Sequence, residues 1–315
     1  MRGAKVLVIG ATGTVGGEAV RSLLAHERVE VRALVRDPES LAARSLAPSV
    51  VRRRGDAGDR ASLSRALEGV SALLYVSPHS RDEEALAENV IACAEAAGAR
   101  LVFVGVHVDG NAVTRWMRRT MFGALLPHYR PKLRLSERVR ACAARPVVLC
   151  ATNFFQNDAL FVDAIARGEL VTPMSSRGMN RVDVRDVGDA AARALLDPTL
   201  ESGAYPVVGP CSLTGPECAA ILSRAWGREV RSVGQDLTAL EREANAVLSG
   251  DKRSDILASY RALARLPLPT DPRELARTTA LLGRPPRAYE DYAAHLHAQW
   301  LARAVTSSSA TAGVR

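Results

Sequence analysis

Short apolar runs and helical stretches alternate through residues 4–151 of the chain. The predicted strands are KVLVIG, VEVRALV, SVVRRR, SALLYVS, ARLVFVGV and RPVVLCA, of which SVVRRR is the least apolar. The longest helical stretch between them, DEEALAENVIACAEAAG, ends at a glycine. Strands that alternate with helices form βαβ units, whose parallel strands are buried on both faces. The sequence therefore predicts an α/β fold with a doubly wound parallel sheet.

The alternation changes after residue 151. Two short strand candidates, GELVTP and GAYPVVG, lie among longer helical stretches such as GPECAAILSRAWG. We therefore predict a first domain over residues 1–155 and a smaller, helix-rich lobe that residues 156–302 mainly form. The strand and helix near residues 180–197 are open to assignment to either domain. Residues 303–315 are small and polar, which predicts a disordered tail.

The composition is that of an ordinary globular protein, with 47% hydrophobic and 24% charged residues. No apolar run approaches the roughly 18 residues that a membrane helix needs, and the N-terminus MRGAKVLVIG is too short for a signal peptide. The five cysteines are scattered, without a CxxC pair, which argues against a disulfide framework and a metal site. We expect a cytoplasmic protein that holds no metal.

The net charge of +8 comes almost wholly from arginine, because the chain has only three lysines. Such a charge indicates either an anionic partner, such as nucleic acid, or an arginine-rich surface that is simply solvated. No helix face is uniformly basic over several turns, which favours the second interpretation. The chain also lacks a helix-turn-helix pattern, so we expect no direct nucleic-acid partner and no membrane partner.

Three glycines, Gly10, Gly13 and Gly16, follow the first predicted strand and open the first predicted helix in VLVIGATGTVGG. In a βαβ unit they are typical of dinucleotide binding, because they permit a tight turn, close approach of a pyrophosphate and close helix packing. N–H groups at the start of the helix would face the phosphates. The alternative is a glycine-rich turn without a ligand. We favour a Rossmann-type domain that binds NAD(P). Its predicted contacts here are Gly10, Thr12, Gly13, Thr14, Val15 and Gly16.

The end of the second predicted strand, VRDP, bears on which dinucleotide is bound. An acidic residue at this position binds the ribose hydroxyls of NAD, whereas an arginine suits the 2′-phosphate of NADP. Arg36 stands at the strand end and Asp37 follows it. The sequence therefore favours NADP(H), while Asp37 leaves NAD(H) open. The alternative for Arg36 is an exposed side chain without a ligand.

Several motifs occur in the order in which the NmrA-like family has them. They are GATGTVGG, VRALVRDP, GDAGDRASLSRALEGV, HYRPK, FFQN, VDVRDVGDAAARALLDP and LLGRPPRAYEDY. Over about residues 4–300 the chain resembles this family, an atypical branch of the short-chain dehydrogenase/reductase superfamily. The resemblance implies that Asp56 lies near the adenine and that Ser77 and Pro78 line the adenine ribose and the pyrophosphate. It also implies that the C-terminal lobe covers the nicotinamide end.

Typical members of that superfamily use a serine after the fifth strand and a Tyr-x-x-x-Lys pair. This chain has His107 near the serine position and His128 four residues before Lys132, a His-x-x-x-Lys form that the NmrA-like family often shows. We predict that Lys132 binds the nicotinamide ribose. His128 and His107 are the candidate proton donors, each with an ordinary hydrogen-bonded histidine as the alternative. Pro131 suggests that His128 precedes the helix that carries Lys132.

The segment ATNFFQN follows the sixth predicted strand. In the family it passes the nicotinamide, and its asparagine, Asn157 here, lies beside the substrate cleft. The family usually has Arg-Pro ahead of it, where this chain has Cys150 and Ala151, so the loop shape is left open. Phe154 and Phe155 could form an aromatic wall for a flat acceptor or belong to the core, and we expect one to face each way.

Residues 110–129 form an insertion in which apolar residues recur at near-helical spacing and arginines fall mostly on another face. This pattern predicts an amphipathic helix. We favour a helix that packs over the cleft or serves as a substrate lid, rather than a docking surface for a partner.

Two functions fit the whole pattern. The first is a reductase that passes a hydride from NADPH to a small organic acceptor, such as a quinone, an enone or a similar carbonyl compound. Because a quinone can take its protons from solvent, the missing tyrosine is no barrier to that reaction. The second is a non-catalytic redox sensor that binds the dinucleotide and a protein partner. A homodimer is compatible with either function.

Overall fold

The computed structural model describes residues 3–78, 80–107 and 112–312, and the chain divides into two compact units. The first unit contains the residues up to Thr152, Val184–Val207 and Arg273–Pro285. The second contains Asn153–Asp183, Val208–Pro272 and the residues from Pro286 on.

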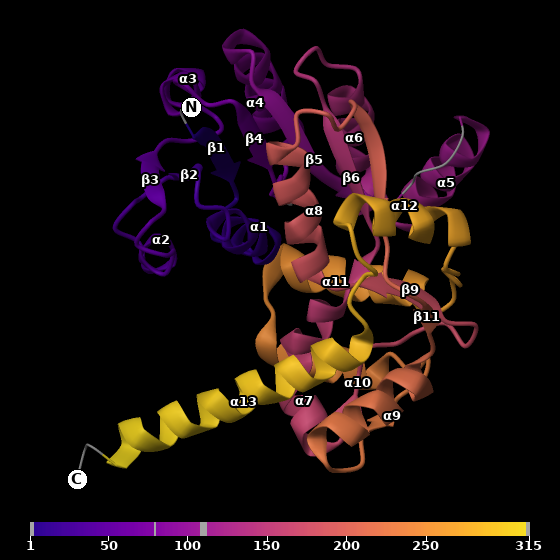
Figure 1. The fold of residues 1–315 in the computed structure, drawn as a ribbon. Helices are drawn as coiled ribbons and strands as arrows, with labels where there is room; N and C mark the ends of the chain where they lie inside the picture. The colour runs from indigo at the N-terminus through magenta and orange to yellow at the C-terminus, as the bar shows by residue number, and fades with distance from the viewer. Residues whose placement is uncertain (1–2, 79, 108–111, 313–315) are drawn as a thin grey trace. The chain divides into compact units, whose positions relative to one another are not determined.

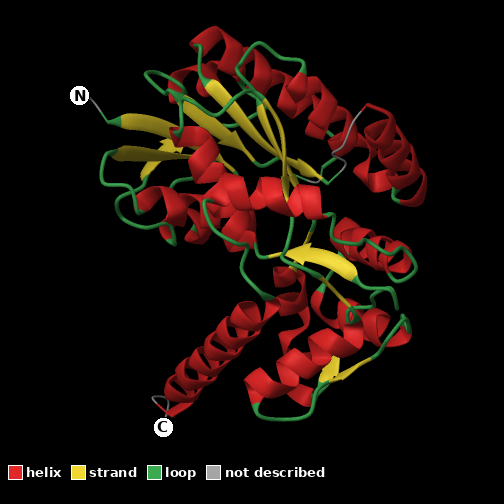
Figure 2. Ribbon diagram, turned by 45° about the vertical axis from the view of Figure 1, so that its right-hand side comes forward, coloured by secondary structure: helices red, strands yellow, loops and turns green. Residues whose placement is uncertain are grey.

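A seven-stranded parallel sheet forms the centre of the first unit (Figure 2). Its strands are β1 (Ala4–Ile9), β2 (Val29–Val35), β3 (Val51–Arg54), β4 (Ala72–Tyr75), β5 (Arg100–Val106), β6 (Val147–Ala151) and β10 (Gly203–Val207). They lie in the order β10-β6-β5-β4-β1-β2-β3, so the direction of winding reverses between β1 and β4. This is the order of a doubly wound Rossmann-type sheet, and the predicted fold class is confirmed.

Helices cover both faces of this sheet. The helices of this unit are α1 (Thr14–Leu24), α2 (Leu41–Arg44), α3 (Arg60–Ala66), α4 (Glu83–Ala97), α5 (Ala112–Leu125), α6 (Arg130–Arg140), α8 (Val184–Leu196) and α12 (Pro272–Leu282), with a 3-10 turn η1 (Pro127–Tyr129) before α6. Of these, α5 contacts η1 and α6. Apolar side chains of α3, α4 and α6 share one buried cluster with β1, β4 and β5. Helices α1 and α8 pack against each other, and α8 also contacts β4, β5 and β6.

Two segments of the first unit were placed in the C-terminal lobe by the sequence analysis. Strand β10, from GAYPVVG, pairs with β6 at the edge of the sheet, where Pro206 can be accommodated although it has no N–H to donate. Helix α12 lies beside β10. Arg277 donates to the carbonyl of Ala204 at 2.6 Å, and Thr278 donates to that of Pro206 at 2.9 Å. The residues that make these contacts are far apart in the sequence, so the sequence does not reveal that β10 and α12 belong to the first unit.

The second unit is mostly helical, with short strands (Figure 1). Its helical elements are η2 (Phe155–Phe161), α7 (Val162–Arg167), α9 (Gly215–Trp226), α10 (Thr238–Val247), α11 (Gly250–Leu263) and α13 (Tyr289–Ala312). Its strands are β7 (Asn153–Phe154), β8 (Glu169–Leu170), β9 (Met179–Val182), β11 (Ser212–Leu213) and β12 (Arg231–Ser232). The unit has its own apolar core, which includes Phe155, Trp226 and Tyr289.

Helix α13 continues to Ala312, beyond residue 302, where the sequence analysis placed the end of the lobe, and residues 313–315 lie outside the described residues. Across the described chain, no helix is both long and apolar enough to cross a membrane. Among the same residues, no group of three His, Cys, Asp or Glu side chains is placed to hold a metal ion.

Candidate functional site

The first unit contains a cavity of about 860 Å³ beyond the carboxyl ends of β1 to β4. Ligands of doubly wound sheets bind at this edge, where the strand order reverses. The predicted residues that line the cavity are Gly10, Thr12, Gly13, Arg36, Asp56, Ser77 and Pro78. Val15 and Gly16 are buried, and Thr14 is exposed as the first residue of α1.

The loop between β1 and α1 requires glycine at two of its positions. Gly10 has φ +89°, and a Cβ there would lie 3.0 Å from the carbonyl oxygen of Val76. A Cβ on Gly16 would overlap the carbonyl oxygen of Gly10. Gly13 precedes α1 and has no side chain to cap the helix, so the first N–H groups of α1 receive no side-chain acceptor from it. The loop therefore presents backbone donors and the positive end of the helix dipole, which suit a phosphate.

Arg36 and Asp37 both line the cavity, but their surroundings differ. Asp37 Oδ1 accepts the backbone N–H of Glu39 at 3.0 Å, and the Asp37 carbonyl accepts the hydroxyl of Ser40 at 2.9 Å. The Asp37 carboxylate is thus engaged in its own turn. Arg36 is exposed, and its guanidinium is available to an anion.

Asp56 lies across the cavity, after β3. Its Oδ1 accepts the backbone N–H of Gly58 at 2.7 Å, and its own N–H donates to Ser62 Oγ at 3.0 Å. These bonds fix the loop and leave the second carboxylate oxygen to accept from a ligand.

Lys132 belongs to a buried polar group that the sequence analysis missed in part. Its Nζ lies 3.0 Å from Ser77 Oγ, 3.2 Å from the Ser77 carbonyl and 3.3 Å from Glu83 Oε1. Burial lowers the pKa of the Lys132 ammonium, and the Glu83 carboxylate opposes that shift. Glu83 had no motif to mark it, and its one signal is an acidic pair, Glu83 and Glu84, at the start of a predicted helix.

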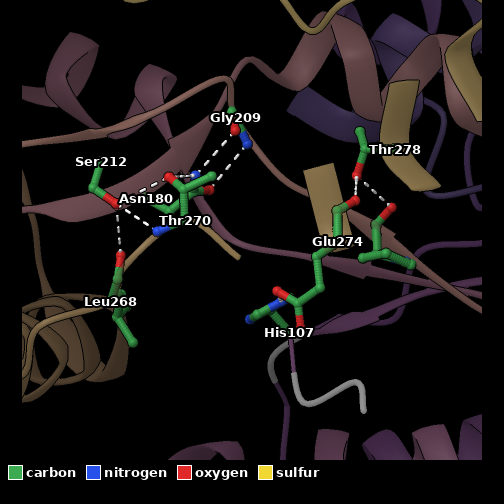
Figure 3. A network of polar contacts seen from close by, with 9 residues as sticks. His107, Asn180, Gly209, Ser212, Leu268, Thr270, Glu274 and Thr278 are labelled. Carbon is green, nitrogen blue, oxygen red and sulfur yellow. Dashed lines mark hydrogen bonds and ion pairs between the residues drawn. The ribbon is translucent and has the colours of Figure 1, made fainter. Parts of the chain in front are cut away.

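His107 follows β5 and lies close to a second residue that the sequence analysis did not identify. Its Nε2 lies 2.8 Å from Oε2 of Glu274 on α12, and the Glu274 carbonyl accepts the hydroxyl of Thr278 at 2.9 Å (Figure 3). A carboxylate at this distance fixes the orientation of the ring.

His128 precedes the helix of Lys132. It lies in the 3-10 turn, η1, half-buried, with its ring 4.7 Å from that of Tyr129. Pro131 stands in the first turn of α6. His128 and Lys132 therefore do not share one continuous α-helical face.

The predicted substrate residues all belong to the second unit. Phe155 is buried, with its ring edge-on to Tyr289 at 5.0 Å, whereas Phe154 and Asn157 are half-buried. Asn157 Nδ2 donates to Asn153 Oδ1 at 3.3 Å.

A buried ion pair anchors this segment. Arg181 donates to both oxygens of Asp158 at 2.9 Å, and it also donates to the carbonyl of Phe154 at 2.9 Å. Tyr289 donates its hydroxyl to Asp158 Oδ2 at 2.6 Å. Elsewhere in this unit, Asn180 bonds in both directions with Gly209 and donates to Thr270 (Figure 3).

The helix predicted in the insertion is α5, while residues 108–111 lie outside the described residues. Arg115 pairs with Glu137 at 3.4 Å. Large apolar side chains on another part of the helix surface are exposed, namely Val113, Trp116, Met117, Met121 and Leu125.

The cavity in the first unit suits a phosphorylated dinucleotide. It combines backbone donors at a helix N-terminus, a glycine loop that a Cβ would obstruct, an exposed arginine and a carboxylate. Helix N-termini and arginine bind phosphates, and a carboxylate accepts from an amino or hydroxyl group.

Known proteins that bind NAD(P) resemble this chain in sequence and in fold. The chain is 30% identical to an NAD(P)H azoreductase from Xenophilus azovorans, over 91% of this chain and 96% of that protein. Its fold is similar to that of an NADPH-dependent quinone oxidoreductase from Escherichia coli, with a TM-score of 0.73, 24% identity and coverage of 92% and 99% of the two chains. It is also similar to the fold of NmrA, a negative transcriptional regulator solved in complex with NADP, with a TM-score of 0.70, 19% identity and coverage of 93% and 95%.

A sequence profile of the NmrA-like family matches residues 2–248, which is most of the chain. The match spans the glycine loop, the arginine after β2, the buried Lys132 and the strands that position them. The chain belongs to the NmrA-like family.

Proposed function

We propose that this chain is an NADPH-dependent reductase that passes a hydride to a small organic acceptor, with quinones, enones and similar flat carbonyl compounds as the substrate class. The observation that carries the proposal is the cavity of about 860 Å³, with the glycine loop at one wall and Arg36 at another. The names of an azoreductase and a quinone oxidoreductase among similar proteins support a reductase with a flat acceptor.

Each wall of the cavity has a role in this proposal. The N-terminus of α1 binds the pyrophosphate, Arg36 binds the 2′-phosphate, and Asp56 accepts from the adenine. When bound, NADPH supplies the hydride. The protein lowers the barrier mainly by orientation, which can contribute about 7–11 kcal/mol in well-aligned systems.

The acceptor takes up two electrons and needs protons. A quinone takes these protons from solvent, whereas an enone is helped by a donor in the protein. We propose His107 and His128 as the donors. We propose Phe154 and Asn157 as contacts of the acceptor, with Phe155 supporting them from the core.

A single-turnover experiment tests the proposal. The protein is loaded with NADPH and mixed with a panel of quinones and enones, and the absorbance of the reduced nicotinamide is followed against a protein-free control. We expect rapid, protein-dependent oxidation of NADPH with at least one acceptor. Tight binding of NADPH without oxidation across the panel would instead favour a sensor.

The exposed apolar side chains of α5 favour a sensor as the second candidate, because such a surface suits a protein partner. Under this alternative the dinucleotide is bound but not consumed, and its redox state controls the association. The similarity of fold to a negative transcriptional regulator is compatible with it. Replacement of Trp116 and Met117 by serine would then leave NADPH binding intact and abolish the association.

A further inference from the structure

We propose that helix α5 docks the protein on an anionic membrane surface, with its exposed apolar face between the lipid headgroups and the acyl chains. The helix lies in the plane of that surface and does not cross the bilayer. From the sequence we expected no membrane partner, because no apolar run is long enough to span a bilayer. A helix that lies on the surface needs no such run.

One side of α5 packs against the rest of the first unit. The helix lies at the periphery of that unit, where it contacts η1 and α6 (Figure 1). Arg115 pairs with Glu137 of α6 at 3.4 Å. A Cβ on Gly123 would lie 3.6 Å from Arg130 Cγ, at the start of α6. Because residues four apart in a helix share one face, Arg115, Arg119 and Gly123 lie on the side turned toward α6.

The opposite side of α5 is apolar and exposed. Four of its side chains are again spaced by four residues, and each is two positions from the row that faces α6. Two positions are about 200° around a helix of 3.6 residues per turn. With a tryptophan beside this row, the set is 40–66% exposed and consists of Val113, Trp116, Met117, Met121 and Leu125. An apolar stripe that runs the length of a helix and faces away from the protein marks an interaction surface.

The charge around this stripe is positive. Residues 112–130 contain four arginines and no aspartate or glutamate, which is half of the chain's net charge of +8. A helix is about 10–12 Å across, and the apolar face of an interfacial helix enters the bilayer by about 5–10 Å. Arginines on the far side of α5 then lie at the level of the lipid phosphates. Tryptophan and aliphatic side chains on one face and arginines on another are the pattern of such a helix.

The same features disfavour two other occupants of the stripe. A second copy of α5 would bring three more arginines and no carboxylate, so a symmetric pair would place like charges together. A protein partner, which the sensor alternative requires, would need an acidic groove shaped to a projecting helix. A fluid layer of anionic lipid conforms to the helix without a preformed groove.

Sedimentation with lipid vesicles tests the proposal. The full chain is mixed with vesicles of phosphatidylcholine alone, or of equal parts of phosphatidylcholine and phosphatidylglycerol, and the bound fraction is measured. We expect binding to the anionic vesicles, weakened by added salt, and little binding to the neutral ones. Absence of binding to the anionic vesicles, or equal binding to both compositions, overturns the proposal.

Two variants with matched controls identify the face that binds. Trp116→Ser/Met117→Ser removes apolar area from the stripe and should weaken binding at least about 10-fold. Val247→Ser, at an exposed apolar position of α10, should not.

The second variant, Arg119→Gln, removes one charge of α5 and should weaken binding about 5-fold. Arg228→Gln, at an exposed arginine after α9, should leave it unchanged. Circular dichroism checks that each variant folds. Equal losses in a variant and its control would mean that the protein adheres through its overall charge, which overturns the role of α5.

Tryptophan fluorescence shows whether α5 itself enters the lipid. The chain has three tryptophans, and the other two, Trp226 and Trp300, pack in the core of the second unit. Brominated lipid quenches a tryptophan that it touches, so we expect anionic vesicles that contain it to quench the wild type. Trp116→Phe keeps an apolar side chain and should still sediment with the vesicles, but without quenching. Quenching that persists in Trp116→Phe would place the contact elsewhere and overturn the assignment.

The oligomeric state gives a further check. If the chain forms a dimer in solution and Trp116→Ser/Met117→Ser dissociates it, a second copy covers the stripe, and the membrane proposal is overturned. A monomer, or a dimer that this variant leaves intact, is the expected result. None of these measurements uses NADPH or an acceptor, so they decide the role of α5 whether or not the reductase proposal holds.

Discussion

The imidazole of His107 and the carboxylate of Glu274 lie 2.8 Å apart, Nε2 to Oε2, although 167 positions separate them in the chain. The two side chains are 18% and 9% exposed. Because the carboxylate occupies Nε2, a proton that the ring passes to an acceptor would have to leave from Nδ1. A neutral ring accepts at Nδ1 and an imidazolium donates there, so His107 can deliver a proton from Nδ1 in its charged form.

His107→Asn therefore separates acceptors by their need for a proton. With an enone, we expect single-turnover reduction to slow by roughly 100-fold, which is a common contribution of general acid catalysis. With a quinone, we expect little change, because solvent supplies the protons. Glu274→Gln should reproduce the enone effect in part, since it removes the charge that orients the ring. His128→Asn is the comparison, and a loss confined to that variant would make His128 the donor.

The glycine loop allows stability and binding to be separated. Gly16→Ala should destabilise the protein, because its Cβ would overlap the carbonyl oxygen of Gly10. Gly17→Ala, the neighbouring control, has its nearest contact at 3.7 Å and should stabilise α1 by about 0.5–1 kcal/mol. At Gly13 the added Cβ would lie 3.4 Å from that same carbonyl oxygen, so the fold can accommodate it.

Gly13→Ala should thus weaken NADPH binding while the midpoint of thermal unfolding stays close to that of the wild type. Unfolding curves and NADPH titrations of the three variants check this. A Gly13→Ala protein that binds as tightly as the wild type would mean that the ligand does not approach this residue.

The first unit was largely predictable because its information is local. Most of the strands from β1 to β6 come from largely apolar runs, with β3 and its three arginines as the exception. In the loop after β1, Gly10 has a positive φ that favours glycine. Strand β10 was predicted as a strand but assigned to the wrong lobe, since only its pairing with β6 reveals its place.

Glu83 and Glu274 could not be found in the same way. Acidic residues near helix starts are common, and neither residue belongs to a motif. Their roles follow from contacts with Lys132 and His107, which lie far away in sequence and become visible only once α4, α6 and α12 are packed.

The ion pair of Arg181 and Asp158 should dominate the stability of the second unit. Their side chains are 1% and 0% exposed, and Arg181 also lies over the ring of Phe155, 5.8 Å from its centroid. Removal of one partner of a buried pair commonly costs about 3–5 kcal/mol, because the other charge is left in the interior. We expect Arg181→Met to lower the free energy of unfolding by that amount in denaturant titrations.

The exposed pair of Arg261 and Glu241 serves as the control, since pairs of this kind contribute less than about 1 kcal/mol. If Arg261→Met and Arg181→Met proved equally stable, burial of the Asp158 pair would not be what holds the segment from Asn153 to Asp158 in place.

The preference for NADPH over NADH should depend on Arg36. Hydrogen bonds to a charged group contribute about 1.5–3 kcal/mol, which corresponds to roughly 10–100-fold in affinity. We expect Arg36→Ala to weaken NADPH by that factor and to leave NADH unchanged, because only NADPH has the 2′-phosphate. Arg44→Ala is the control, since Arg44 is a nearby exposed arginine that pairs with Glu39 at 2.6 Å. Dissociation constants for both cofactors at one salt concentration give the ratio. If Arg36→Ala left this ratio unchanged, a group other than Arg36 would bind the 2′-phosphate. Asp37 is not suited to that role, because its carboxylate accepts the N–H of Glu39.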